Sequence, residues 1–305
     1  MVIFTGLLII CNFAVLAAYS RVIMSVSLMQ EGHTITVFNS QDEGQTWGQP
    51  HNFFKSFNVS SPFKDIEVTA LKPGCAHGIQ IEADLCEGGC QEAGRLLLPM
   101  VCTNKSAHGS HTDKGCTTCL ACNIFSDDGG RSWTVGGVGQ VGTRESALVQ
   151  LSSSTRHAEL YVNERNMGAS PGHRLIAHSN DGGQTYGGYA MDKQLTSPVT
   201  PHWTGIVAGV NRFTTPSTVH PLGELIFTSP FSTTSRANLT ARVSTDEGRS
   251  WDAPKVIWSG PSGYSDAAQV GDQSMAVIFE NGDTGFAERI SVSVLSKTWL
   301  TDPYE

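Results

Sequence analysis

Short apolar runs, several of them alternating with polar residues, recur along the whole of this 305-residue chain. The clearest lie at residues 95–101, 159–163, 224–228, 274–280 and 289–295. A period of two over four to eight residues is typical of a half-buried strand, and none of these runs has the 3.6-residue period of a helix. The pattern therefore predicts an all-β protein.

A second regularity is a motif that occurs four times: Ser-x-Asp-x-Gly-x-Ser/Thr followed by an aromatic residue. The copies occupy residues 40–47, 126–133, 179–186 and 244–251, and an apolar run precedes each of them. Asp and the flanking hydroxyls can hydrogen-bond their own backbone, Gly allows a positive φ, and the aromatic ring can pack beneath the turn. The motif therefore predicts a hairpin, and its aspartates are expected to be structural rather than catalytic.

The spacing of this motif indicates the architecture. Its copies start 86, 53 and 65 residues apart, which suits one four-stranded blade for each copy, together with insertions. The 32 Gly, 13 Pro and only 16% charged residues also favour short strands joined by tight turns. A chain of this length can form one large all-β domain, so we expect a single β-propeller.

Charge narrows the choice of partners. The formal net charge is -8 at pH 7, and the chain has no run of Lys and Arg that would neutralise a row of phosphates. Nucleic acid is therefore not an expected partner. An anionic sugar is compatible with an acidic protein, since binding one needs only a local cluster of arginines.

Residues 1–20 form an uncharged, apolar leader with two interpretations. The leader is either a signal peptide that ends in small residues near Ala17 and Ala18, or a truncated pair of strands that belongs to the fold; a membrane span is less favoured. Three sequons, at Asn58, Asn104 and Asn238, would carry glycans only if the chain enters the secretory route.

Seven of the eight cysteines lie between residues 75 and 122. In an oxidising compartment this stretch predicts a disulfide-pinned insertion at about residues 72–122. The alternative is a zinc site, because the Cys-x-x-Cys-x-x-Cys run at 116–122 lies close to His108 and His111. Cys86 and Cys90 are spaced too widely to supply a second Cys-x-x-Cys pair, so disulfides are favoured. Their pairing does not follow from the sequence.

Four copies of this motif, the Asp-box, together with several local segments, resemble the catalytic domain of exo-α-sialidases (neuraminidases), above all the lysosomal type. The segments are Asn-Glu-Arg-Asn at 163–166, Ser-Arg-Ala-Asn-Leu-Thr at 235–240, Gly-Pro-Ser-Gly-Tyr-Ser at 260–265 and Phe-Ala-Glu-Arg-Ile-Ser-Val at 286–292. The resemblance implies a six-bladed β-propeller of the sialidase type over residues 21–305, incomplete at its N-terminus. It also implies sialylated glycoconjugates as partners, no cofactor, and a lysosomal or extracellular location, with membrane association left open.

The chemistry of sialic acid explains the residues that such a site needs. Its carboxylate is attached to the carbon that is attacked, so an acidic nucleophile would meet like charge. A neutral phenol avoids this repulsion, but its normal pKa near 10 means that a base must remove its proton. Sialidases are the tyrosine exception among glycosidases.

The resemblance implies a role for each of five residues. Tyr264 corresponds to the nucleophile and Glu145 to its general base, while Arg165 and Arg236 correspond to guanidinium groups that grip the substrate carboxylate. Glu288 corresponds to a carboxylate that supports a further arginine. These roles require no metal.

Two parts of the family pattern are not recognisable before Ser40: the arginine of a Phe/Tyr-Arg-Ile-Pro motif and the Asp general acid that follows it. Arg21 is preceded by Tyr-Ser and lacks the proline. Loss of a general acid lowers a rate by about 10² to 10⁴. Two functions therefore stay open: a retaining exo-α-sialidase with a tyrosyl-enzyme intermediate, and a catalytically impaired propeller that binds sialylated glycans or proteins.

Overall fold

The computed structural model describes residues 13–18, 21–28, 34–42, 45–49, 51–52, 68–104, 111–112, 115–116, 119–168, 172–202, 204–214 and 223–302. Strands dominate these ranges, and their helices are the short α1 (Lys297–Thr301) and one 3-10 turn (Ala83–Leu85). Neither is long and apolar enough to span a membrane. The expectation of an all-β protein is confirmed.

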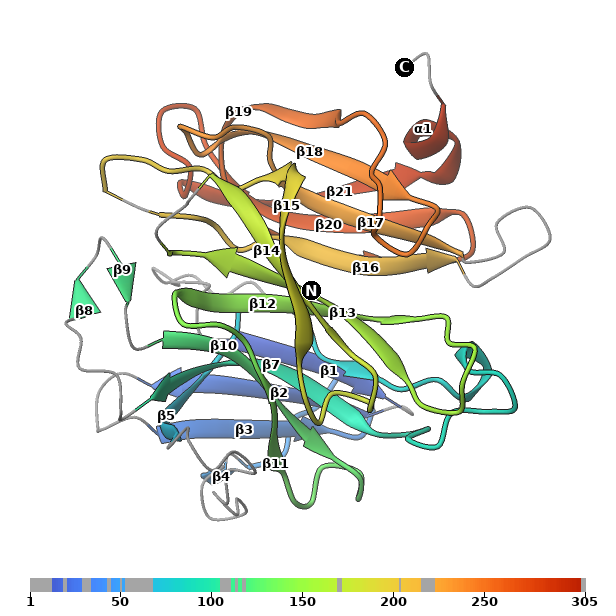
Figure 1. Ribbon diagram of the computed structural model, residues 1–305. Coiled ribbons are helices and arrows are strands. Elements are labelled where there is room, and N and C mark those ends of the chain that lie inside the picture. The colour runs from blue at the N-terminus through green and yellow to red at the C-terminus, as the bar shows by residue number, and fades with distance from the viewer. Residues whose placement is uncertain are drawn as a thin grey trace.

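Antiparallel sheets follow one another along the chain (Figure 1). The first contains β1 (Phe13–Ala18), β2 (Arg21–Leu28), β3 (Thr34–Ser40) and β4 (His51–Asn52). The second contains β5 (Val68–Pro73), β7 (Leu96–Asn104), β10 (Cys119–Ser126) and β11 (Thr134–Val138), with β6 (Ile79–Gln80) beside β7. The third contains β12 (Thr143–Leu151), β13 (Glu159–Asn166), β14 (His173–Ser179) and β15 (Gly187–Thr196).

One long strand, β19 (Lys255–Gln269), belongs to two sheets. Its first part completes the fourth sheet, which also contains β16 (Gly209–Thr214), β17 (Glu224–Pro230) and β18 (Ala237–Ser244). Its second part begins the fifth sheet and pairs with β20 (Ser274–Asn281), which pairs with β21 (Arg289–Ser296). A small separate hairpin joins β8 (His111–Thr112) and β9 (Gly115–Cys116).

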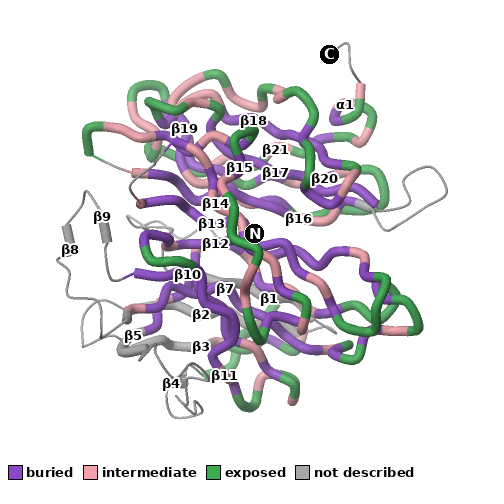
Figure 2. The backbone as a smooth tube through the Cα atoms, in the orientation of Figure 1, coloured by how far each residue is buried: buried purple, intermediate pink, exposed green. Residues whose placement is uncertain are grey.

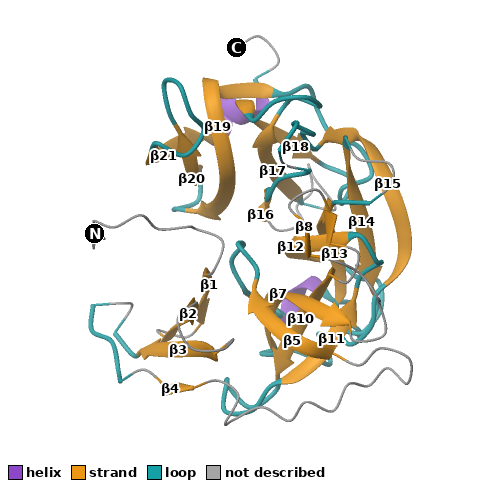
Figure 3. Ribbon diagram, turned by 90° about the vertical axis from the view of Figure 1, so that its left-hand side faces the viewer, coloured by secondary structure: helices purple, strands orange, loops and turns teal. Residues whose placement is uncertain are grey.

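The sheets stand around a common centre in the order of the sequence (Figure 3). The first strands of the third and fourth sheets, β12 and β16, lie toward the middle, and β14 and β15 lie at the outside. This arrangement of consecutive sheets confirms the propeller-type fold.

The Asp-boxes have one place in this fold, because each joins the third and fourth strands of its sheet. In the second copy, Asp128 accepts hydrogen bonds from the Ser126 hydroxyl at 2.8 Å and from the Ser132 backbone and hydroxyl at 2.9 and 2.6 Å. Asp42, Asp181 and Asp246 make the same contacts in their own hairpins. The structural role expected for these aspartates is therefore confirmed.

The apolar cores lie between neighbouring sheets, where the tubes of Figure 2 are buried. Trp251, from the fourth Asp-box, packs against Phe227 in its own sheet and against Tyr161 in the third sheet. By contrast, the fifth sheet exposes one apolar stripe of β20 and β21, formed by Ile278, Ile290, Val292 and Val294. Adjacent sheets therefore hold one another in place by apolar burial, and this stripe is not covered by the described chain.

The cysteine-rich stretch contains disulfides, and part of it is the second sheet itself, because Cys102 lies on β7 and Cys122 lies on β10. Cys86 pairs with Cys90, Cys102 pairs with Cys122, and Cys119 is also disulfide-bonded. These bonds occupy two sulfurs of the proposed Cys-x-x-Cys-x-x-Cys zinc set, so the zinc alternative is wrong for Cys119 and Cys122. His108 lies outside the described residues.

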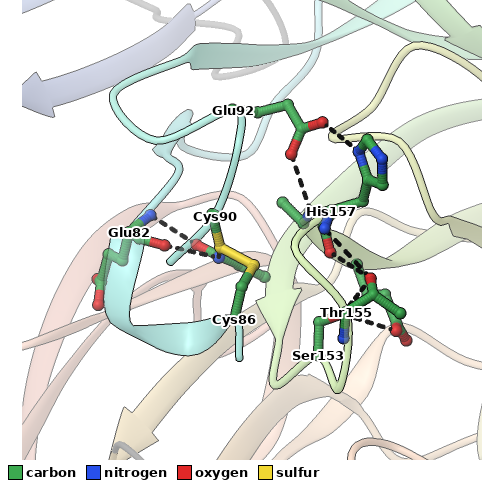
Figure 4. The surroundings of a disulfide bond; sticks show 10 residues. Glu82, Cys86, Cys90, Glu92, Ser153, Thr155 and His157 are labelled. Carbon is green, nitrogen blue, oxygen red and sulfur yellow. Dashed lines mark hydrogen bonds and ion pairs between the residues drawn. A yellow bond between two sulfur atoms is a disulfide. The ribbon is translucent and has the colours of Figure 1, made fainter. Parts of the chain in front are cut away.

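The loop between β6 and β7, which contains Cys86 and Cys90, is fastened to the third sheet through a bridge between Cys86 and Ser153 (Figure 4). Glu92 accepts a hydrogen bond from the backbone of Ala158 and lies 2.7 Å from the His157 ring, on the turn between β12 and β13. Residues 1–12 of the predicted leader, and the sequons at Asn58 and Asn104, lie outside the structure's description of side chains.

Candidate active site

Four of the five predicted site residues lie at one end of neighbouring sheets. Glu145 is near the start of β12, Arg165 is near the end of the antiparallel β13, Arg236 immediately precedes β18, and Tyr264 follows the switch of β19 into the fifth sheet. In antiparallel pairs, the start of one strand lies beside the end of the next. The topology therefore brings together side chains that are up to 119 residues apart (145 to 264).

A β-bulge shapes the Glu145 side of the site. Thr143 pairs with Asn166 and Ser146 pairs with Glu164, so Arg144 and Glu145 together lie opposite Arg165. A bulge of this kind redirects side chains, and bulges are frequent beside active sites. As a result, Arg165 Nη1 lies 3.1 and 3.3 Å from the two Glu145 oxygens, and Arg144 Nε lies 3.6 Å from one of them.

Arg165 also connects the predicted base with the predicted nucleophile. The same Nη1 lies 3.2 Å from the Tyr264 hydroxyl. On its other edge, Nε and Nη2 donate to the Thr204 carbonyl at 3.0 and 2.8 Å, which fixes the plane of the guanidinium. Because the Glu145 oxygens and the Tyr264 hydroxyl contact the same nitrogen of Arg165, the two groups are neighbours in the site.

Arg236 contributes a second guanidinium on the Tyr264 side. Its central carbon lies 5.3 Å from the centre of the Tyr264 ring and 4.7 Å from that of Phe286, and Nη2 donates to the Gly205 carbonyl at 3.3 Å. Cation–π contact over aromatic faces holds a guanidinium in place. Burial lowers the pKa of Arg236, partly offset by Tyr264.

Two consecutive carbonyls, those of Thr204 and Gly205, thus orient both arginines. Gly205 has a positive φ of 68°, and a Cβ there would lie 2.9 Å from Arg165 Cγ and 2.8 Å from the Asn166 carbonyl oxygen. Only glycine fits this position without displacing Arg165. Neither residue was predicted from the sequence, and the only local signal for them is a Thr-Gly pair without a motif around it.

The arginines determine the ionisation of Glu145. Burial favours the protonated acid, but the charges of Arg165 and Arg144 outweigh it and lower the pKa of Glu145. The carboxylate is therefore ionised at neutral and mildly acidic pH, which is the state that a proton acceptor needs.

A further carboxylate, Glu280 on β20, was missed by the sequence reasoning. It is buried, and its Oε2 accepts the backbone N–H of Tyr264 at 2.9 Å. Gly263 allows this approach, because a Cβ at that position would lie 2.2 Å from the same oxygen. Burial raises the pKa of Glu280, while the Tyr264 hydrogen bond and the charge of Arg236 oppose the rise. Glu280 therefore holds the backbone of the predicted nucleophile and interacts with the charge of Arg236.

Glu288 is not brought to the other four residues. Its exposed carboxylate accepts hydrogen bonds from the backbones of Asp283, Thr284 and Gly285, in the turn between β20 and β21. The Thr284 hydroxyl and these backbone donors lower its pKa to about 2. In this structure, Glu288 holds its own turn, and its predicted role in supporting a further arginine stays a prediction.

Comparison with known proteins identifies the family of the chain. The family model of the BNR repeat-like domain matches residues 14–277. The chain belongs to the BNR-repeat family of sialidase-type propellers. The chain is 32% identical over 163 residues to the sialidase of Micromonospora viridifaciens, and the match covers 53% of this chain and 24% of that protein. It is 26% identical over 297 residues to mouse sialidase-3, covering 84% of this chain and 65% of that protein.

The chain therefore spans less than two thirds of the length of each of these two relatives. Its fold is similar to that of Trypanosoma rangeli sialidase in complex with 2,3-difluorosialic acid, described as a covalent intermediate. The TM-score is 0.63 at 15% identity, and the match covers 94% of this chain and 44% of the other. At that identity the likeness shows the fold, and the function has to be argued from the side chains.

Proposed function

We propose that the chain is an exo-α-sialidase, which hydrolyses terminal sialic acid with retention through a tyrosyl-enzyme intermediate. The observation that carries the proposal is the shared contact of Arg165 Nη1 with the Tyr264 hydroxyl and with both oxygens of Glu145. The phenol and the carboxylate each lie within hydrogen-bond reach of one guanidinium nitrogen, which supports a nucleophile and a base that act at the same place on an anionic sugar.

The steps follow from this arrangement. Arg165 and Arg236 bind the sugar carboxylate, and Glu145 accepts the phenol proton as the Tyr264 oxygen bonds to the anomeric carbon. The glycosidic bond breaks, and the leaving oxygen takes a proton from a general acid to which no described residue is assigned. Water then attacks the same carbon from the opposite side and gives a proton back to that acid, while Tyr264 leaves and recovers its proton from Glu145. Two inversions give net retention.

Charge complementarity supports an anionic substrate. Three guanidinium groups, those of Arg144, Arg165 and Arg236, lie near Glu145 and Glu280, in a protein of net charge -8. Local positive potential inside an acidic protein attracts anions and disfavours neutral sugars. Sialylated glycoconjugates are therefore the proposed substrates.

A trapping experiment tests the proposal. Incubation with 2,3-difluorosialic acid is expected to add one sugar mass to the peptide that contains Tyr264, and Y264F should remain unlabelled. With a fluorogenic sialoside, Y264F should lose at least about 100-fold in kcat with little change in KM, and NMR should detect the α-anomer as the first product. Equal turnover by Y264F, or a label on another residue, would remove the nucleophile assignment.

The second candidate is a propeller that binds sialylated glycans without turnover. It is favoured by one observation, the absence of an assigned general acid among the site residues. Saturable binding of sialyllactose by the wild-type chain, together with no release of sialic acid and no covalent label, would decide for it.

For location, we propose the secretory route, lysosomal or extracellular. The support is chemical: disulfides involving Cys86, Cys90, Cys102, Cys119 and Cys122 persist in oxidising compartments. Protection of the expressed protein from protease in intact membrane vesicles would test it, and full accessibility in the cytosol would contradict it.

A further inference from the structure

Arg144 is the outermost of the three arginines at the site. Its side chain is 37% exposed, compared with 3% for Arg165, and Arg236 is also buried. The bulge in β12 turns Arg144 toward the same side as Glu145. The site thus has two enclosed guanidinium groups and one that faces solvent.

The contact of Arg144 with Glu145 leaves most of its hydrogen-bond donors available. Nε lies 3.6 Å from Glu145 Oε1, which is beyond a normal hydrogen bond, and Arg165 already donates to both oxygens of that carboxylate. A guanidinium carries five donors in a fixed fork that matches a carboxylate or a sulfate. The geometry therefore leaves Arg144 able to bind a second anion.

Arg144 is on the solvent side of Glu145, the next residue along β12. The strand begins at this end of the sheet and runs away from it through Leu151. The Arg144 side chain is 37% exposed, and that of Glu145 is 5% exposed. The sugar next to the one being cleaved lies on the solvent side of an exo-acting site.

We propose that Arg144 binds an acidic group on the sugar adjacent to the terminal sialic acid, so that the site prefers substrates with two anionic sugars in succession. The inference rests on the proposed function and deepens it. The shared chemistry is a second anion, which can be the carboxylate of another sialic acid or a sulfate ester.

The test is a comparison of binding in the Y264F background, where the ligands are not turned over. Calorimetry would measure 3′-sialyllactose (neutral neighbour), α2,8-linked disialic acid (carboxylate) and 6-sulfated sialyllactose (sulfate). At least one acidic ligand is expected to bind about tenfold more tightly than sialyllactose. R144Q should abolish that preference, R144K should keep most of it, and R131Q, which removes the same charge from an exposed Asp-box turn, should keep all of it.

The outcomes separate this inference from the proposed function. Equal weakening of all three ligands by R144Q, or no change in any of them, overturns the role of Arg144 while the sialidase proposal stands. If R144Q removes only the preference for disialic acid, the second anion is a carboxylate, and if only that for the sulfated ligand, it is a sulfate. Failure of all three ligands to bind, together with no cleavage of the fluorogenic sialoside by wild type, overturns both.

Discussion

Nδ1 of His77 lies 2.9 Å from Oδ1 of Asp266, and the His77 backbone N–H donates to Oδ2 of the same carboxylate at 2.9 Å. The pair joins the segment after β5 to the inner part of β19, across 189 residues of sequence. Asp266 follows Tyr264 by two residues and lies in the same strand. The pair thus ties the strand that carries the predicted nucleophile to the second sheet.

We expect H77A to lower kcat by about tenfold with a smaller change in KM, because His77 positions Tyr264 without touching the substrate. H77N, whose amide nitrogen can replace Nδ1 as donor to Asp266, should restore most of the activity. Steady-state kinetics on a fluorogenic sialoside would measure both variants. Equal loss in H77N and H77A would argue against positioning through this hydrogen bond.

The same pair should make stability depend on pH. Burial of His77 disfavours its charge, but Asp266 outweighs this effect and raises the pKa of His77 above 6.5. A raised histidine pKa gives stability that is fully present below about pH 6.5 and is lost as pH rises through the folded-state value. The melting temperature of wild type should therefore exceed that of H77N by more at pH 5.5 than at pH 8.5. If the difference in melting temperature between wild type and H77N is the same at both pH values, Asp266 does not stabilise the charged form of His77.

Substitution of the two glutamates of the β20–β21 hairpin should have different effects, one on activity and the other on stability. E280A removes the acceptor for the Tyr264 backbone N–H and is expected to lower kcat/KM by at least about tenfold, since a lost hydrogen bond to a carboxylate is worth about 1.5–3 kcal/mol. E288A should lower the melting temperature by loosening its own turn, with kcat/KM nearly unchanged. The reverse result would show that the Glu280 hydrogen bond does not support Tyr264.

Glycine at position 205 should be required for substrate binding. G205A forces a side chain into a left-handed backbone conformation and against Arg165 Cγ, so we expect KM to rise about tenfold and stability to fall by about 1–3 kcal/mol. G187A is the matched control, because a Cβ at Gly187 would meet nothing within 4 Å. If G205A has the kinetics of wild type, the Thr204–Gly205 pair does not fix the arginine.

Glu164 should destabilise the protein at alkaline pH. Its side chain is fully buried, neither oxygen has a hydrogen-bond partner among the described residues, and burial raises its pKa to about 8 against the charge of Arg174. The unfolded chain releases this proton near pH 4.5, so stability falls as pH rises from there to about 8.

The neutral variant E164Q removes that dependence. Its free energy of unfolding, measured with urea, should equal that of wild type at pH 4.5 and exceed it by about 1–3 kcal/mol at pH 8. E87Q, at an exposed glutamate, serves as the control. If the free energies of unfolding of E164Q and wild type depend on pH in the same way, Glu164 is ionised in the folded protein with little loss of stability.

The repeated hairpins could be predicted because their chemistry is local. An Asp-box contains its own donors, acceptors and glycine within eight residues, so the four copies fold in the same way in four different sheets. The strand runs, and through the spacing of the boxes the propeller, follow from the same short-range periodicity. The grouping of Tyr264, Glu145, Arg165 and Arg236 was expected from a resemblance to a family, and their roles stay predictions.

By itself, the sequence determined which segments form strands and turns and which residue types are available for an anionic sugar. Only the tertiary structure decided that Arg144 and Glu145 share one position opposite Arg165, that Thr204 and Gly205 orient both arginines, and that Glu280 holds the Tyr264 backbone while Glu288 holds its own turn. A bulge shifts the alternation of a strand by one residue, and which of two nearby carboxylates faces the centre depends on pairing with distant strands. These contacts arise between sheets and have no signature in the local pattern.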